Sequence, residues 1–311
     1  MKKRLSHLML LLVCFNNILA QDNDAAIKSK LDTLNEKIEN HFLKKDAASL
    51  TKYYDTELTY YPEYKLAIFS LDSLKQFFND WFSEVDIKTF KKKIYKAESF
   101  PGFILEIGAF QMLYAISHTS MSSAYNGKYM IIWKKTGNNQ LTILSEAFSA
   151  DKYIDPDAVP YSKVKVTETN IMPDHKKLDK ALLAEIEVQN GDVISAVARG
   201  DGNDRAKGFV NDGIYMPHFD TILDGINNIR PYMLKTYSPE AQFRVKHNFY
   251  RVFDFGKMVL INGHFDGGWG NEKDGGVFTG NMSSLLRREN GKLLMYCQLP
   301  NNDKMIVSYK N

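Results

Sequence analysis

The sequence predicts an α+β fold of two tandem cone-shaped domains, each a curved antiparallel sheet wrapped around three helices. In each half of the chain, helical periodicity of apolar residues comes first and strand-like alternation follows, which is typical of α+β domains. Each half closes with a hairpin, Gly127–Asp151 in the first and Gly280–Leu299 in the second. In both hairpins a glycine opens the first strand, two cations end it, and Asn with Gly makes the turn. One module therefore occurs twice.

The first half begins with helical patterns and ends in long strands. Apolar residues three and four positions apart predict amphipathic helices, and a change to a period of two predicts strands. The predicted helices are Ala25–Leu43, Asp46–Tyr54 and Ser70–Phe82, and the predicted short strand is Glu57–Tyr61. The predicted long strands are Ile87–Ser99, Phe103–Tyr114 and the two arms of the hairpin.

The second half repeats this order. The predicted helices are Leu178–Ile186, a second that starts at Asn190 and runs to Ala198, and a third at Ile222–Tyr237. Pro231 predicts either a kink within the third helix or its first turn. The predicted strands are the short Gly213–Pro217, the long Ala241–Asp254 and Lys257–Phe265, and the hairpin. Helices laid across the concave face of such a sheet would bury their apolar faces and leave a conical pocket.

The chain opens with a predicted signal peptide, residues 1–20. Lys2, Lys3 and Arg4 form a basic start, a short apolar run follows, and Ala20 is a suitable cleavage point. We therefore expect an exported protein, periplasmic or secreted, with domains at 21–155 and 174–311 and a proline-containing linker at 156–173. An uncleaved anchor is the alternative, but the apolar run is shorter than the ~20 residues of a membrane helix.

Charge and cysteine content exclude several classes of partner. The sequence has 40 Lys and Arg against 37 Asp and Glu, and the leader holds three of those cations and no carboxylate, so the mature chain has 37 of each. A neutral chain does not favour nucleic acid, whose binding depends on clustered cations. Cys297 alone survives cleavage, so no internal disulfide is expected. We expect no membrane association after cleavage, and no cofactor, because no phosphate loop, nucleophile elbow or dinucleotide fingerprint occurs.

Several short stretches carry a family resemblance. In the first half they are the long first helix, Tyr53-Tyr54-Asp55 before the short strand, and Gly127–Trp133; in the second they are Gly191-Asp192, Phe209–Asp212 before Ile214–Pro217, and Gly280–Leu299. Each half resembles the nuclear transport factor 2-like superfamily, in its SnoaL-like, ketosteroid-isomerase-like branch, which includes domain-of-unknown-function family 4440. That superfamily contains isomerases, cyclases, dehydratases, ligand binders and dimerisation modules, so the resemblance implies a fold and a pocket more than one function.

Candidate catalytic residues gather in the second half. The resemblance implies a carboxylate that moves a proton, so Asp220 or Asp266 is the candidate base, with His247 or His264 beside it. The alternative is that these are exposed loop side chains beside glycines, or half-buried histidines with satisfied hydrogen bonds. Side chains of the same types, His218 included, also bind metals, but their spacing matches no recognised metal site, so no metal is predicted.

The candidate ligand-binding residues are mostly aromatic. They are Tyr215, His218, Tyr250 and Trp269 in the second half and Tyr61, Glu106 and Tyr114 in the first. Either Tyr215 or Tyr250 could donate a hydrogen bond to an oxyanion. Glu106 alternates with apolar residues on one face of its strand, so it could point into a pocket or pair on the convex side.

Three functions fit this sequence. The first is an exported protein that holds a small apolar or amphipathic molecule in a conical pocket. The second is a cofactor-free isomerase or lyase that uses an Asp/His acid–base pair in the second domain. The third is a scaffold in which the two domains pair through their sheets as a homodimer would. The interior of the second pocket discriminates between them: a buried carboxylate or histidine that faces an empty apolar cavity favours catalysis, an apolar cavity alone favours binding, and a filled interior favours a scaffold.

Overall fold

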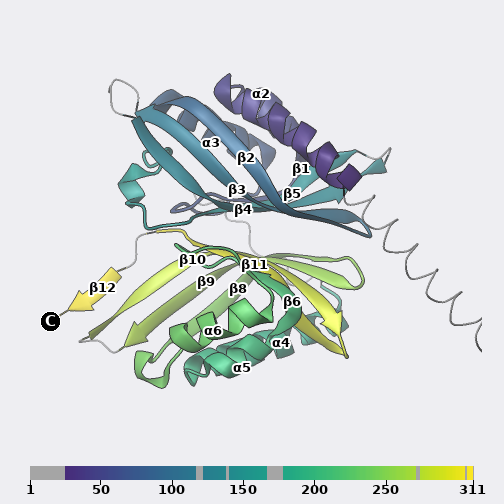
Figure 1. Ribbon diagram of the computed structural model, residues 1–311, viewed down its shortest axis with the longest axis vertical. Coiled ribbons are helices and arrows are strands. Elements are labelled where there is room, and N and C mark those ends of the chain that lie inside the picture. The colour runs from purple at the N-terminus through teal and green to yellow at the C-terminus, as the bar shows by residue number, and fades with distance from the viewer. Residues whose placement is uncertain are drawn as a thin grey trace, which may run out of the picture.

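The computed structural model describes residues 25–116, 122–137, 140–166, 178–270, 274–304 and 307–310. The predicted signal peptide and residues 167–177 of the predicted linker lie outside the described residues. Cleavage after Ala20 and the domain boundaries therefore stay predictions. Two sheets face each other at the centre of the molecule, and helices cover the far side of each (Figure 1).

The first unit is a five-stranded sheet with helices on one face. A helix covers residues 25–43, and α2 (Ala47–Leu50), η1 (Thr51–Tyr53), β1 (Tyr54–Tyr61) and α3 (Leu71–Glu84) follow. The long strands are β2 (Val85–Phe100), β3 (Phe103–Ile116), β4 (Ser122–Lys135) and β5 (Leu141–Ala150), in the order β1-β5-β4-β3-β2. The short η3 (Pro156–Ala158) comes next, and Tyr161 of the predicted linker is buried in the first core.

The second unit repeats the arrangement. Its helices are α4 (Lys180–Ala198), α5 (Gly202–Lys207), α6 (Ile226–Thr236) and the short η5 (Pro239–Ala241). Its strands are β6 (Phe209–Tyr215), β7 (Leu223–Asp224), β8 (Arg244–Asp254), β9 (Met258–Gly270), β10 (Asp274–Glu289), β11 (Lys292–Asn302) and β12 (Val307–Lys310). The order is β7-β6-β11-β10-β9-β8, and β12 pairs with β10. The predicted α+β fold with two cones is therefore confirmed.

The structure departs from the prediction of purely antiparallel sheets. The short strand of each unit pairs in parallel with the last long strand, β1 with β5 and β6 with β11, whereas the long strands pair antiparallel. A helix separates the short strand from the long ones in the chain. The strand that follows this helix, β2 or β8, runs opposite to the short strand, and three successive hairpins then bring the chain back as β5 or β11 in the direction of the short strand. A parallel pair needs a long connection of this kind, because a tight hairpin joins only antiparallel strands.

The prediction of two helices around Asn190 is wrong. α4 runs without a break through Asn190 and Gly191. An added Cβ at Gly191 would meet nothing, so this glycine lies on an open face, while Ile186 and Val193 on either side of it are buried. Burial of this apolar stripe outweighs the ~1 kcal/mol that an interior glycine costs a helix. The third helix also begins later than predicted, after Gly225, and Pro231 lies inside it.

The two glycines that open the hairpins occupy equivalent positions. Gly127 pairs with Phe110 on the neighbouring strand, and Gly280 pairs with Phe265. A Cβ on Gly127 would lie 2.9 Å from a ring carbon of Phe110, and a Cβ on Gly280 would lie 2.5 Å from a ring carbon of Phe265. In both units only glycine leaves room for the aromatic ring that lies across the strand.

The equivalence extends to the helices with a constant offset of 155 residues. Asp46 and Asp201 each cap a short helix by accepting a hydrogen bond from the backbone N–H three residues later. Leu31 and Ile186, also 155 residues apart, are both fully buried. Each residue from the first helix to β3 can therefore be compared with its counterpart in the second unit.

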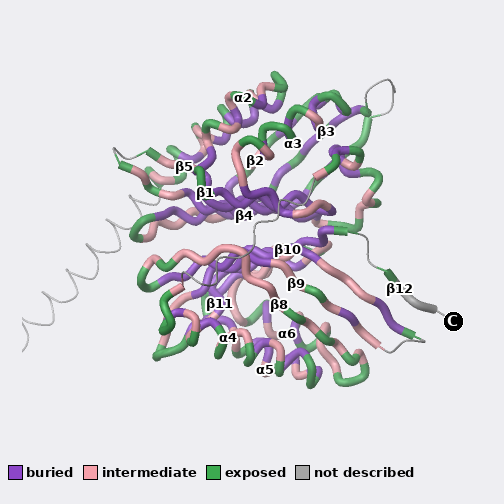
Figure 2. The backbone as a smooth tube through the Cα atoms, turned by 180° about the vertical axis from the view of Figure 1, so that it is seen from behind, coloured by how far each residue is buried: buried purple, intermediate pink, exposed green. Residues whose placement is uncertain are grey.

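The helix-free faces of the two sheets pack against each other. One buried hydrophobic cluster includes side chains of both, among them Phe103, Leu105, Met130 and Ile132 from the first and Leu260, Leu285, Tyr296 and Leu299 from the second. Figure 2 shows the buried backbone concentrated where the sheets meet. Both faces of each sheet are thus buried along much of their length.

One pair of backbone hydrogen bonds between the two units is reciprocal. The Tyr64 N–H donates to the Asn302 carbonyl at 2.6 Å, and the Phe219 N–H donates to the Ala150 carbonyl at 3.2 Å. Tyr64 and Phe219 are equivalent positions and share a left-handed backbone, with φ of 60° and 59°. Contacts in which each partner repeats the other's role are those of an approximate two-fold axis.

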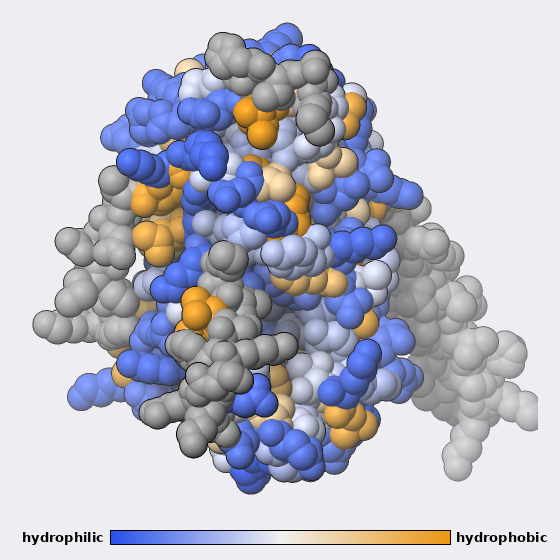
Figure 3. All heavy atoms as spheres, turned by 90° about the vertical axis from the view of Figure 1, so that its left-hand side faces the viewer, coloured by the Kyte–Doolittle hydropathy of each residue, from blue (hydrophilic) through white to orange (hydrophobic). Residues whose placement is uncertain are grey.

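The surface is mainly polar. On the side shown in Figure 3, hydrophilic residues dominate and apolar residues form small separate groups. Within the described ranges, the helices are too short or too polar to span a bilayer.

Candidate functional site

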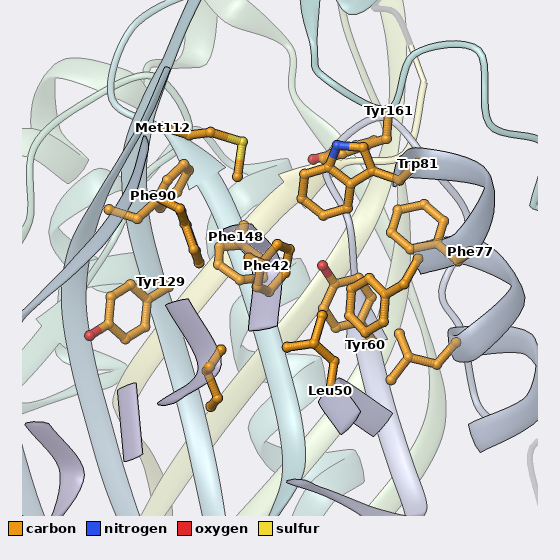
Figure 4. Close-up of a cluster of buried hydrophobic side chains, with 14 of the residues drawn as sticks. Phe42, Leu50, Tyr60, Phe77, Trp81, Phe90, Met112, Tyr129, Phe148 and Tyr161 are labelled. Carbon is orange, nitrogen blue, oxygen red and sulfur yellow. The ribbon is translucent and has the colours of Figure 1, made fainter. Parts of the chain in front are cut away.

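The first cone is filled by its own side chains. Phe42, Trp81, Phe90, Met112 and other large residues converge between the helices and the sheet (Figure 4). Trp81 packs on Phe42 at a ring-centroid distance of 5.3 Å and on Tyr161 at 4.9 Å. The criterion stated above for the second pocket, applied to the first, favours a scaffold role.

The second cone contains a cavity of about 480 Å³ between α4, α5 and α6 and the sheet. Aromatic side chains form much of its wall, namely Tyr215, Tyr232, Tyr237, Phe243, Trp269 and Phe278. A cavity of this size and composition is typical of small-molecule sites.

The cavity exists because the second unit carries smaller residues at equivalent positions. Phe42 corresponds to Val197 and Trp81 to Thr236, by the constant offset of 155 residues. Met112 corresponds to Gly267, as the strand pairing also shows. The space that Phe42 and Trp81 fill in the first cone is open in the second, whereas the ring of Phe278 covers Gly267, where a Cβ would lie 2.3 Å from it.

The inner end of the cavity is polar. Arg205, Gln298 and His247 line it, and all three also border a void of about 20 Å³ that reaches into the core. Arg205 is 5% exposed, and its Nη2 donates to Gln298 Oε1 at 3.3 Å. Its counterpart in the first unit is Leu50, which is buried in the apolar core. The second unit thus has a cation where the first has a hydrocarbon.

His247 is held neutral beside that cation. Its Nδ1 lies 2.6 Å from Asn190 Oδ1, an acceptor, so Nδ1 carries the proton. Burial, and secondarily the charge of Arg205, lowers the pKa of His247 to about 4. An imidazole with so low a pKa is a weak base at neutral pH, so it is better suited to hydrogen bonding than to proton abstraction.

A second histidine in the cavity wall is paired with a carboxylate from the other unit. His218 Nε2 donates to Glu63 Oε1 at 2.5 Å, and Glu63 is fully buried. The Tyr125 hydroxyl and the Ala150 N–H donate to the other oxygen of Glu63, at 2.8 and 3.0 Å. Glu63 and His218 are 155 residues apart, so they are equivalent positions that meet at the approximate two-fold axis. The carboxylate fixes the orientation and the tautomer of the imidazole.

The remaining catalytic candidates lie away from the cavity. His264 and Asp266 project from the opposite face of β9, where His264 Nε2 lies 2.8 Å from Asp303 Oδ2 and Asp266 accepts from Asn248. Asp220 is exposed, and its carboxylate accepts from the N–H of Thr221. The structure therefore does not bring either aspartate together with His247, whereas it places His264 Nδ1 3.9 Å from Asp266 Oδ2, outside the cavity.

The ligand-binding candidates divide similarly. Tyr215, His218 and Trp269 line the cavity, whereas Tyr250 packs on Phe69 between the two units. Tyr61 belongs to the cluster between the sheets, and the Tyr114 hydroxyl donates to the carbonyl of Ala158.

Glu106 is enclosed in the first core. It accepts hydrogen bonds from Asn35 Nδ2, the Tyr129 hydroxyl and Trp133 Nε1, each at 2.7 Å. Three donors satisfy the buried carboxylate, so it is a structural group of a filled cone.

Two residues of the site were missed as site residues by sequence reasoning. Arg205 lies in a short segment with Asp204 and Lys207, which is typical of a solvated helix. The repeat contained a signal, because Arg205 aligns with the apolar Leu50. Glu63 forms its contact with a residue 155 positions away, and no local pattern reports such a pairing. Across the described ranges, no group of three or more His, Cys, Asp or Glu residues is placed to hold a metal ion.

No protein-family model and no curated protein matches this chain. The narrower resemblance to domain-of-unknown-function family 4440 therefore stays a prediction.

Several solved structures are similar to part of this chain. An NTF-2 like protein of unknown function from Shewanella oneidensis MR-1 is 14% identical, with a TM-score of 0.33, over 39% of this chain and 98% of its own. A ketosteroid isomerase-like protein from Erwinia carotovora atroseptica SCRI1043 is 12% identical, with a TM-score of 0.35, over 40% and 94%. A protein of unknown function from Mycobacterium tuberculosis is 15% identical, with a TM-score of 0.37, over 41% and 79%.

Proposed function

We propose that this protein binds a small amphipathic molecule in the cavity of its second unit. The observation that carries the proposal is a cavity of about 480 Å³ with aromatic walls and a polar inner end, at positions where the first unit is packed solid. Aromatic walls supply apolar contact area, and a few convergent polar groups fix a ligand's orientation. The first unit then serves as a scaffold that pairs with the second as one subunit of a homodimer pairs with the other.

Refilling the cavity tests this proposal. The double variant Val197→Phe with Thr236→Trp places the large residues of the first unit at the equivalent positions of the second. We expect it to fold and to lose the small molecule that wild-type protein, purified from its own host, retains in native mass spectrometry. The reason is steric, because the new rings occupy the space that the ligand needs.

A matched control uses the same change on the outside of the same helix. Val188 lies on α4 and is 60% exposed, so Val188→Phe should leave the retained mass unchanged. A ligand that stays bound to the folded double variant would place the binding site elsewhere and overturn the proposal.

A second candidate, a cofactor-free isomerase or lyase, is favoured by the His218–Glu63 pair. An imidazole that is oriented by a buried carboxylate and borders a cavity is a suitable general base. In such a reaction His218 would take a proton from carbon and return it to another position of the same molecule.

Proton exchange tests this candidate directly. In D₂O, wild-type protein should exchange the α-protons of at least one member of a panel of enolisable ketones, followed by proton NMR. His218→Gln should abolish that exchange while the melting temperature changes little. Exchange that persists in folded His218→Gln, or no exchange with any ketone in wild type, would leave binding as the function of the cavity.

A further inference from the structure

Arg205 is a buried cation without a counter-ion. Its guanidinium lies over the ring of Phe209, 4.9 Å from the centroid, and its Nη1 has no hydrogen-bond partner in the part of the chain that the structure describes. Gln298 supplies one neutral acceptor, at the long distance of 3.3 Å. A charge removed from water is costly unless it is paired. The guanidinium of Arg205 therefore lacks an anionic partner, and the described part of the chain does not supply one.

The acidic residues near Arg205 are engaged elsewhere. Asp204 pairs with Arg199 and with Lys207, and Glu185 pairs with Arg288. These two acids line a second hollow of about 710 Å³, which Arg205 also borders. No carboxylate of the described residues forms an ion pair with Arg205. Of the two hollows that Arg205 borders, the 710 Å³ one is lined by several acids, whereas no acid is among the described residues that line the aromatic cavity, so an incoming carboxylate is favoured in the aromatic cavity.

We propose that the ligand of the second cavity is a monocarboxylate, with its carboxylate paired to Arg205 and its apolar body against the aromatic wall. The proposal rests on the binding function proposed above and names the class of ligand. A planar guanidinium matches a carboxylate in shape and charge, and the pair gains strength where water is excluded.

The charges of the residues that line the cavity favour a ligand with one negative charge over a ligand with two. His247 is neutral at physiological pH, as its lowered pKa shows, and the other arginine in the lining, Arg244, is exposed and donates to the carbonyl of Gly270. One buried cation therefore faces the ligand at the inner end. Gln298 holds the guanidinium in place there, and Trp269 and Phe278 accept the apolar end.

The test compares two probes that share one ring system, 2-naphthoate and 2-naphthalenemethanol, by calorimetry on the full chain. Wild type should bind the naphthoate at least ten times more tightly than the alcohol. Arg205→Gln should lose that preference and bind both probes with affinities within about twofold of each other. Arg205→Lys keeps the charge, so it should retain part of the preference for naphthoate. This variant provides the comparison if Arg205→Gln fails to fold.

The outcomes separate the two proposals. Equal binding of both probes to wild type would overturn the carboxylate assignment and leave the binding cavity standing. Failure of both probes to bind would count against the cavity as a ligand site as well. A preference for naphthoate that survives in folded Arg205→Gln would assign it to another cation, such as Arg244.

Discussion

Replacing Glu63 with alanine should lower the free energy of unfolding by about 3–5 kcal/mol. The substitution removes the acceptor of three buried donors, on His218, Tyr125 and the backbone of Ala150. His218 and the Ala150 N–H then lose this partner in a region that water does not reach freely, while the Tyr125 hydroxyl keeps only its contact with the Tyr161 hydroxyl at 3.2 Å. Because Glu63 belongs to one unit and His218 to the other, the loss should weaken the contact between units. Urea denaturation followed by circular dichroism measures the effect.

Glu57→Ala is the matched control for this substitution. Glu57 lies on β1, the strand that ends just before Glu63, and its side chain is 60% exposed in its ion pair with Lys134. Such pairs contribute roughly 0–1 kcal/mol, so this variant should unfold close to wild type. Similar losses in the two variants would show that the Glu63 contact contributes little to stability.

Trp81→Ala should cost about 3–5 kcal/mol, because it opens a cavity in the filled first cone. Trp81 is 3% exposed and packs on Phe42, Phe77 and Tyr161. Its indole N–H has no partner among the described residues, so the loss is one of packing rather than hydrogen bonding. The midpoint of thermal unfolding should fall accordingly.

The equivalent position in the second unit supplies the control. Thr236 borders a cavity that already exists, so Thr236→Ala should change stability by less than about 1 kcal/mol. Comparable losses at the two positions would contradict the distinction between a filled and a hollow cone.

Much of the fold could be predicted from the sequence because the chain repeats its strongest local signals. The glycines at 127 and 280 mark positions where an aromatic ring lies across the strand, so the hairpins that they open were recognisable in both halves. The break predicted at Asn190-Gly191 failed for a physical reason. Tertiary burial of Ile186 and Val193 sustains the helix through a residue of low helix propensity.

The site was harder to predict because both faces of each sheet are apolar. The period of two places His247 on one face with Val245, which also lines the cavity, and His264 on one face with Met258 and Leu260, which belong to the cluster between the sheets. It could not indicate which group faces the helices, since the opposite face packs against the other unit rather than against water. His247 and His264 were therefore predicted as alternative partners of one catalytic aspartate, although they lie on opposite sides of the sheet.

The pairing of Glu63 with His218 also determines which halves can associate. Were two copies of the first unit to pair by the same contact, two buried carboxylates would meet, and they would repel each other strongly. Two copies of the second would bring two imidazoles together without a carboxylate between them. An acid matched to a base thus favours the mixed assembly over either self-assembly. Because the two units differ and pair with each other rather than with themselves, the core of one can be completely filled by side chains while the other keeps a cavity for a ligand.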